Sequence, residues 1–127
     1  MSPDEIIRKR RESMEVFKLA RKADAKAVHR TLNRPPKGKG WVQGVNMPEG
    51  LMCRPDGVRE SIELYKKAYA IFPDIVLLNQ IAIACEMIGE LEPAREYARM
   101  MKAQAEREGN QTYAQGADIQ LARLGDR

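Results

Sequence analysis

Hydrophobic positions recur at helical spacing through the centre of the chain, between residues 59 and 103. Over residues 75–88 they fall three, four and seven positions apart, which places them on one face of a helix. Asp74 stands where an N-cap is needed, and Gly89 stands where a left-handed residue ends a helix. A second apolar set begins a few residues later, so we expect an antiparallel partner helix. The residues that set the pattern are Leu77, Leu78, Ile81, Ala82, Cys85 and Ile88, then Ala94, Tyr97, Ala98 and Met101.

The helix expected before Pro73 has apolar residues on more than one face between Ile62 and Phe72, so it needs neighbours on two sides. The following helical pair supplies one of them. Residues 2–32 supply the other, because they form one long amphipathic pattern. Ser2 and Glu5 have the spacing of a capping box, with a proline between them at the first helical position.

Residues 33–57 interrupt the helical pattern with repeated prolines and glycines. Trp41 and several aliphatic residues within them favour burial over disorder. We expect an irregular loop insert, with a short hairpin around residues 41–47 as an alternative. The length suits one domain over residues 1–127, divided into a basic amphipathic helix (1–32), a Gly/Pro-rich loop (33–57) and a helical region (58–127).

One turn signal occurs twice in the last part of the chain, and two helical patterns accompany it. The turn at Ile88-Gly89-Glu90 returns about one repeat length later at Leu124-Gly125-Asp126. Before the first turn, Leu78-x2-Ile81-Ala82-x2-Cys85 occupies the positions of W-x2-L-G-x2-Y, and after it Ala94-x3-Ala98 occupies those of A-x3-F. In these features residues 59–127 resemble the tetratricopeptide repeat (TPR) family, as a degenerate array of about one and a half repeats.

The resemblance implies an all-α fold of antiparallel helical hairpins, stacked as a short TPR-like array behind the long N-terminal helix and the loop insert. It also implies a non-catalytic protein–protein interaction module or accessory subunit of a larger complex. Such proteins bind partners in a groove lined by the first helix of each repeat. The corresponding outward positions are Asn79, Ile83, Glu86, Met87, Gln115 and Ile119. Because so short an array offers little groove, self-association is a second mode of contact.

Charge supports an alternative function. Residues 1–40 carry a net charge of +7 and residues 41–127 carry −3, so the basic character belongs to the N-terminal third. This is the electrostatic footprint of a nucleic-acid-associated, ribonucleoprotein-type protein, although a solvated helix face gives the same pattern. Trp41 either stacks on a base or packs the loop onto the helices. The candidate contacts to an anionic partner are Arg8, Arg10, Arg11, Arg34, Lys37, Lys39 and Trp41.

Catalytic and metal-binding patterns do not occur in the sequence. His29 is the single histidine, and Cys53 and Cys85 cannot supply the four ligands of a structural zinc site. Neither glycine-rich nucleotide-binding motif occurs. We therefore expect no enzymatic activity, no cofactor and no metal.

The chain also lacks the pattern of a membrane segment. Its longest uncharged run, residues 75–85, is shorter than the roughly 20 residues that span a bilayer. Basic residues 8–11 stand where a signal peptide would be apolar, and the cysteines show no paired spacing. We expect a cytoplasmic protein with no membrane partner.

Overall fold

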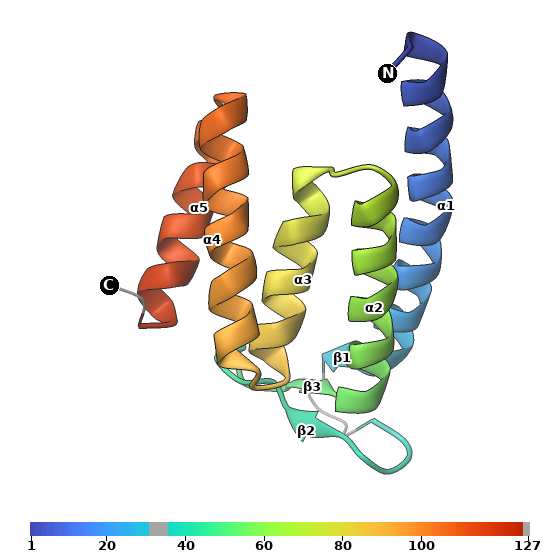
Figure 1. The fold of residues 1–127 in the computed structure, drawn as a ribbon. Helices are drawn as coiled ribbons and strands as arrows, with labels where there is room; N and C mark the ends of the chain where they lie inside the picture. The colour runs from blue at the N-terminus through green and yellow to red at the C-terminus, as the bar shows by residue number, and fades with distance from the viewer. Residues whose placement is uncertain (31–35, 126–127) are drawn as a thin grey trace.

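Helices that run alternately in opposite directions build the molecule (Figure 1). The computed structural model describes residues 1–30 and 36–125, and most of them are helical, which confirms the all-α class. Each helix packs beside the next one in the sequence. The helices are α1 (Pro3–Ala27), α2 (Pro55–Ile71), α3 (Ile75–Met87), α4 (Leu91–Glu108) and α5 (Gln111–Arg123).

Local signals fix the helix ends as the sequence predicts. The Ser2 hydroxyl accepts a hydrogen bond from the backbone N–H of Glu5, and Pro3 opens α1. The Asp74 carboxylate accepts from Val76 N–H at 2.9 Å. Gly89 follows α3 at φ 80°, a conformation that glycine adopts without a Cβ penalty.

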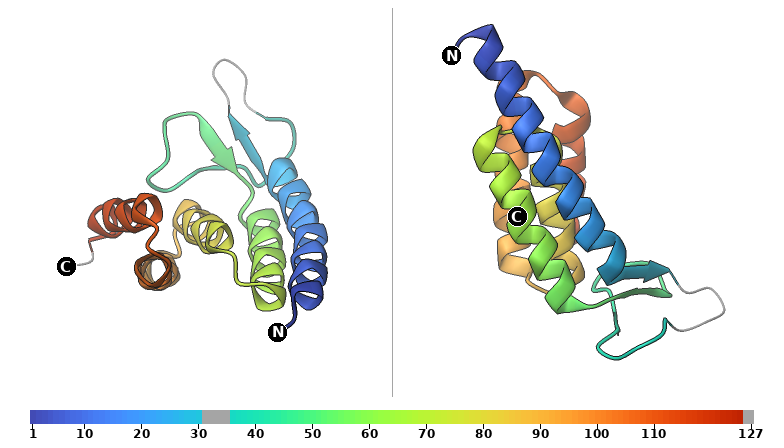
Figure 2. Two further views of the ribbon diagram at one scale, coloured as in Figure 1. Left: turned by 90° about the horizontal axis from the view of Figure 1, so that it is seen from above. Right: turned by 90° about the vertical axis from the view of Figure 1, so that its right-hand side faces the viewer.

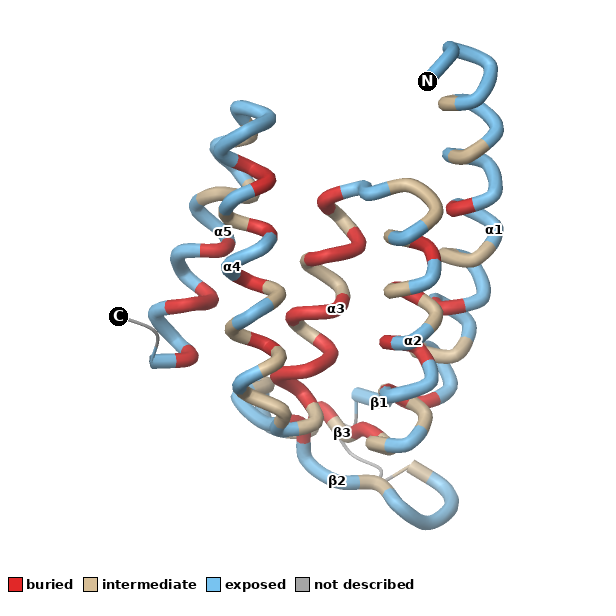
Figure 3. Tube along the Cα trace, viewed as in Figure 1, coloured by how far each residue is buried: buried red, intermediate tan, exposed pale blue. Residues whose placement is uncertain are grey.

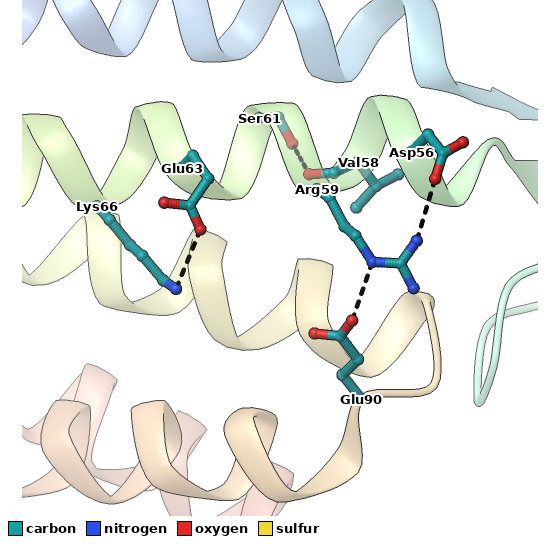
Figure 4. A network of polar contacts seen from close by, with 7 residues as sticks. All are labelled: Asp56, Val58, Arg59, Ser61, Glu63, Lys66 and Glu90. Atoms are coloured by element: carbon teal, nitrogen blue, oxygen red, sulfur yellow. Dashed lines mark hydrogen bonds and ion pairs between the residues drawn. The ribbon is translucent and has the colours of Figure 1, made fainter.

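The long N-terminal helix covers α2, as predicted. The two helices lie side by side in the view from above (Figure 2). The buried Ser13 hydroxyl of α1 donates to the Ala68 carbonyl of α2 at 2.9 Å, and the rings of Phe17 and Tyr65 pack 5.8 Å apart. On the other side of α2, Arg59 donates to Asp56 and to Glu90, which precedes α4 (Figure 4).

The N-terminal helix is shorter than predicted, and the insert is more regular. The helix ends at Ala27, not at residue 32, because β1 (Val28–Arg30) leaves it to pair with β3 (Leu51–Cys53). Strand β2 (Val42–Gln43) pairs with the other edge of β3. The result is an antiparallel sheet of order β1-β3-β2 at one end of the helices, in place of an irregular loop.

Burial explains why this sheet forms. In β3, Leu51 and Cys53 are buried while Met52 between them is half-buried, the alternation of a strand with one face on a core. The predicted hairpin at residues 41–47 is therefore a wider one, running from β2 to β3. Its loop is held by Gln43, whose side chain accepts from Gly50 N–H and donates to the Pro48 carbonyl.

The core follows the predicted helix faces. Buried positions, red in Figure 3, lie where the helices face each other. One cluster joins α1, β3, α2 and α3, and two smaller ones join α3, α4 and α5. The predicted inward residues of α3 and α4 that are buried are Leu77, Leu78, Ile81, Ala82, Cys85, Ala94, Ala98 and Met101, and Tyr97 and Ile88 are half-buried.

Candidate functional site

The residues predicted to line a groove do not form one open surface. Gln115 and Ile119 of α5 are exposed, and Asn79 and Ile83 of α3 are half-buried. Met87 was expected to face outward but is only 7% exposed, and Glu86, expected beside it, is fully buried. The prediction that Glu86 and Met87 face outward is therefore wrong. Both are covered by tertiary contacts, which a helical pattern does not show.

That contact is a polar clasp at the C-terminal end of α3. Arg123 of α5 donates from Nε and Nη2 to the two carboxylate oxygens of Glu86, both at 2.7 Å. Asn46 of the insert donates to the same carboxylate at 3.1 Å, and Val45 N–H donates to the Met87 carbonyl at 2.9 Å. Glu86 and Met87 thus fasten the insert and α5 to α3.

The clasp also sets the charge of its carboxylate. Burial by itself raises the pKa of Glu86, but hydrogen bonds from Arg123 and Asn46 outweigh it and lower the pKa below its ordinary value. A charged, bidentate pair at this position is a structural link between three segments.

A groove opens elsewhere, between α1 and α3. Residues of these two helices and the end of α2 enclose a cavity of about 330 Å³. Its lining is mostly apolar, with one arginine and one aspartate. The lining residues are Arg10, Ser13, Met14, Phe17, Phe72, Asp74, Val76 and Leu77.

Exposed apolar residues extend this groove along α1. Met14 is 51% exposed, and Ile7, 56% exposed, lies two helical turns before it on the same line. The Arg10 guanidinium lies 5.0 Å from the centre of the Phe72 ring, which forms the floor. This arrangement can hold apolar side chains of a partner. The sequence analysis missed Met14 and Phe72 as site residues, although the seven-residue spacing from Ile7 to Met14 was a usable signal.

A second concave surface lies on the other flank of α1. A cavity of about 500 Å³ there brings together Lys22 and Lys26 of α1 with Arg54, and its one acidic lining residue is Glu60. Both lysines lie within the basic helix predicted over residues 1–32, but neither is among the predicted site residues. Their four-residue spacing, continued backwards by Lys18, is the signal that could have found this flank.

The residues predicted to contact an anionic partner fall into two groups, one near the start of α1 and one in the insert. Arg8, Arg10 and Arg11 are exposed on α1, and Arg8 is 3.9 Å from Glu12. Arg30, which the helical interpretation included, lies on β1. Arg34 lies outside the described residues.

Trp41 does not extend from the insert. Its ring lies 4.6 Å from the Arg54 guanidinium and 6.0 Å from His29, and its indole N–H donates to the Lys37 carbonyl. Arg54 also donates to the carbonyls of Lys37 and Lys39, whose side chains remain exposed. The half-buried indole packs within the insert and against the start of α2.

The two thiols are buried and free. Burial raises the pKa of both, that of Cys85 to about 11, so neither is a thiolate at neutral pH. Among the described residues, no three His, Cys, Asp or Glu side chains are grouped so that they could hold a metal ion. None of the helices in the same ranges has the length and apolarity that a bilayer crossing requires.

Comparison of the chain with family models, with curated proteins and with solved structures gave no match.

Proposed function

We propose that this chain is a non-catalytic protein–protein interaction module, or accessory subunit of a larger complex in the cytoplasm, that binds its partner in the groove between α1 and α3. One observation carries the proposal. A mostly apolar cavity of about 330 Å³ opens between two helices, and the exposed Ile7 and Met14 continue it along α1. An exposed apolar strip of this kind typically marks an interaction site.

The TPR-like sequence pattern supports the same surface. In a TPR-like array the first helix of each hairpin lines the groove, and α1, α3 and α5 have that position in the alternating order of helices. The half-buried Asn79 and Ile83 lie on α3 beyond the cavity, and the exposed Gln115 and Ile119 lie on α5. The binding surface proposed here keeps these four residues and leaves out Glu86 and Met87, which the clasp occupies.

The test is affinity purification of the tagged chain from its native lysate, with nuclease present. We expect Met14→Glu and Ile83→Glu to abolish capture of a stoichiometric partner, because each places a charge in the apolar strip. Both variants should keep the helical circular-dichroism signal of the parent.

Leu19→Glu is the matched control, since Leu19 is 55% exposed on α1 but lies on the opposite flank. Capture that survives both groove variants, or that falls equally in Leu19→Glu, would remove the groove from consideration. Capture of a second copy of the chain alone would instead identify self-association as the function of the surface.

A second candidate function is nucleic-acid association through the other flank of α1. The observation that favours it is the convergence of Lys22, Lys26 and Arg54 around the second cavity, with the exposed Lys37 and Lys39 in the adjacent insert. A surface that contacts phosphates loses affinity steeply with salt, and retention on nucleic acid that does not change with salt would exclude this function.

A further inference from the structure

The small sheet of the insert has one face turned away from the core. Leu51 and Cys53 of β3 are buried, so Met52 between them points to the opposite side. Met52 is paired with His29 of β1 and with Gln43 of β2, both of which are exposed. Side chains of residues paired across strands lie on the same face of a sheet. The outer face therefore carries an exposed histidine and an exposed glutamine beside the half-buried methionine.

Two further side chains extend this outer face beyond the strand ends. Trp41 precedes Gln43 by two residues, so the alternation of an extended chain places it on the same side. Arg54 follows Met52 by two residues in extended backbone. The contacts agree with this placement, since the Trp41 ring centre lies 6.0 Å from that of His29 and 4.6 Å from the Arg54 guanidinium. Three flat groups, an imidazole, an indole and a guanidinium, thus meet on one face.

Backbone contacts hold two of these groups in place. Arg54 donates from Nε to the Lys39 carbonyl and from Nη2 to the Lys37 carbonyl, while the indole N–H of Trp41 donates to the Lys37 carbonyl. The indole is half-buried, and the imidazole of His29 beside it is exposed. Groups that are already fixed lose little conformational freedom when a ligand packs on them.

Unpaired lysines surround the three flat groups. The side chains of Lys37 and Lys39 are exposed in the insert. Arg54 also lines the second cavity, where Lys22 and Lys26 lie. Among residues 1–30 and 36–125, none of these four lysines forms an ion pair. The outer face of the sheet is therefore continuous, through Arg54, with the basic flank of α1.

Acidic residues are fewer in this region. Asp56, in the first turn of α2, is paired with Arg59 at 3.2 Å. Glu60 lines the second cavity, and Glu49 lies in the loop between β2 and β3. The four lysines and Arg54 outnumber these carboxylates, so the surface favours an anionic partner.

The flat groups distinguish between anionic partners. An acidic protein offers carboxylates alone, whereas a nucleic acid offers phosphates together with flat bases. Histidine, tryptophan and arginine are among the side chains on which bases stack. In a duplex the bases are stacked on each other, so a single strand is the form that can present them to this face.

We propose that the outer face of the sheet binds single-stranded nucleic acid. A base stacks against His29 and the half-buried Trp41, and the neighbouring phosphates contact Lys37 and Lys39. The inference rests on the second candidate function, because it names the form of nucleic acid and adds the sheet face to the basic flank of α1.

The experiment uses the full chain and a fluorescein-labelled oligothymidylate of about 12 nucleotides, within the length that one single-strand site covers. An abasic oligomer of the same length keeps the phosphates and removes the bases. A stable DNA hairpin supplies a duplex, an oligoglutamate supplies a polyanion without phosphate or base, and an oligouridylate compares RNA with DNA. Binding is followed by fluorescence anisotropy over a range of salt concentrations.

A second readout reports on the ring itself. Trp41 is the single tryptophan of the chain, so its emission can be followed without interference from another indole. We expect unlabelled oligothymidylate to quench this emission and the abasic oligomer to leave it unchanged, because only a base can stack beside the ring.

We expect oligothymidylate to bind about fivefold more tightly, or better, than the abasic oligomer, the hairpin and the oligoglutamate, as a stacked base contributes. His29→Ala should lose about fivefold in affinity, and His29→Phe, which keeps a flat ring, should retain it. Lys37→Gln with Lys39→Gln should reduce the slope of log affinity against log salt by about 1.4, roughly 0.7 for each phosphate contact on a single strand.

The matched control is Arg8→Gln with Arg11→Gln. It removes two exposed cations from the opposite end of α1 and should bind oligothymidylate as the parent does. A loss as large as that of the Lys37 and Lys39 variant would show that only total charge matters, which contradicts a site on the sheet.

Equal affinity for oligothymidylate and the abasic oligomer, or binding without quenching of Trp41, would overturn the inference. So would an equal loss in His29→Ala and His29→Phe, or preferential binding of the oligoglutamate. If all the nucleic acids bind equally and with a steep salt dependence, the second candidate function stands and only the single-strand site is excluded. If none binds, both fail, and the groove proposed for a protein partner is unaffected.

Discussion

At the scale of single residues, Glu86 shows how burial changes the role of a side chain. On a helical wheel it falls at the edge of the apolar face of α3, where a charged residue is ordinarily exposed. The structure buries it completely and pairs it with Arg123, which is itself 42% exposed. A buried carboxylate is tolerated because three hydrogen bonds from two other segments satisfy its oxygens.

Removing the partner of this carboxylate should be more costly than removing its charge. Arg123→Met leaves Glu86 buried without its bidentate, positively charged donor, so we expect the free energy of unfolding to fall by about 2 kcal/mol. That figure lies below the roughly 3–5 kcal/mol of fully buried pairs because Arg123 is partly solvated. Glu86→Gln should cost less, because a neutral amide needs no counter-charge.

The pH dependence gives a second measurement on the same pair. The pKa of Glu86 is lower in the folded chain than its ordinary value of 4.5, so its stabilising effect is fully present above pH 4.5. That stabilisation is lost as pH falls through the folded pKa. Urea unfolding should therefore show a difference between the parent and Glu86→Gln at pH 7 that shrinks at acidic pH. A difference independent of pH would contradict the ionised pair.

At the scale of elements, the packing of α1 on α2 depends on Gly57. This residue lies in the first turn of α2, where the sequence pattern favoured the end of a loop. A Cβ atom added at Gly57 would lie 2.7 Å from the Cβ of Ala27, the last residue of α1. The glycine is thus required by the close approach of two helices, which helix propensity alone does not indicate.

Gly57→Ala should destabilise the protein although alanine is the better helix former. We expect a loss of about 1–3 kcal/mol in the free energy of unfolding, the usual cost of overpacking a tight contact. Gly116→Ala in α5 is the control, because nothing lies within 4 Å of its added Cβ. It should stabilise the protein by up to about 1 kcal/mol. Equal effects of the two substitutions in thermal unfolding would refute the close-contact explanation.

At the scale of the whole molecule, α1 separates two surfaces of different character. One flank joins α3 in a mostly apolar groove whose charged lining residues are Arg10 and Asp74. The other joins α2 and the insert around Lys22, Lys26 and Arg54. Because the flanks lie on opposite sides of one helix, a substitution on either should leave the other intact.

One variant on each flank tests this independence. Lys22→Gln with Lys26→Gln should weaken any retention on nucleic acid and reduce the slope of log affinity against log salt by about 2, roughly 0.9 for each phosphate contact on duplex DNA. The same variant should capture a protein partner as the parent does. Met14→Glu, in the groove, should show the opposite result. Loss of both activities in either variant would mean that the flanks do not act separately.

How much of the fold was predictable differs between the helices and the insert. The amphipathic patterns of α3 and α4 and the caps at Ser2, Asp74 and Gly89 were sufficient, because each depends on neighbours within about four residues. Strand β1 was hidden, since Val28 and the residues before it continue a helical pattern. Its pairing with β3 is set by residues far along the chain and by the burial of Cys53.

The candidate site was less predictable than the fold. The basic character of α1 and the presence of exposed residues on α5 were visible in the sequence. The location of the groove was not, because its floor is Phe72 from the end of α2 and its walls come from α1 and α3. A helical wheel describes one helix at a time and does not show which flank a neighbour leaves open.

By itself, the sequence determined which segments are helical, where most of them begin and end, and which faces are apolar, since these properties arise from interactions between near neighbours. Only the tertiary structure decided that Glu86 is a buried link and that Gly57 is a point of helix contact. Those outcomes depend on Asn46, 40 positions from Glu86, on Arg123, 37 positions from it, and on Ala27 of a different helix. Contacts over such separations are set by the packing of the whole chain.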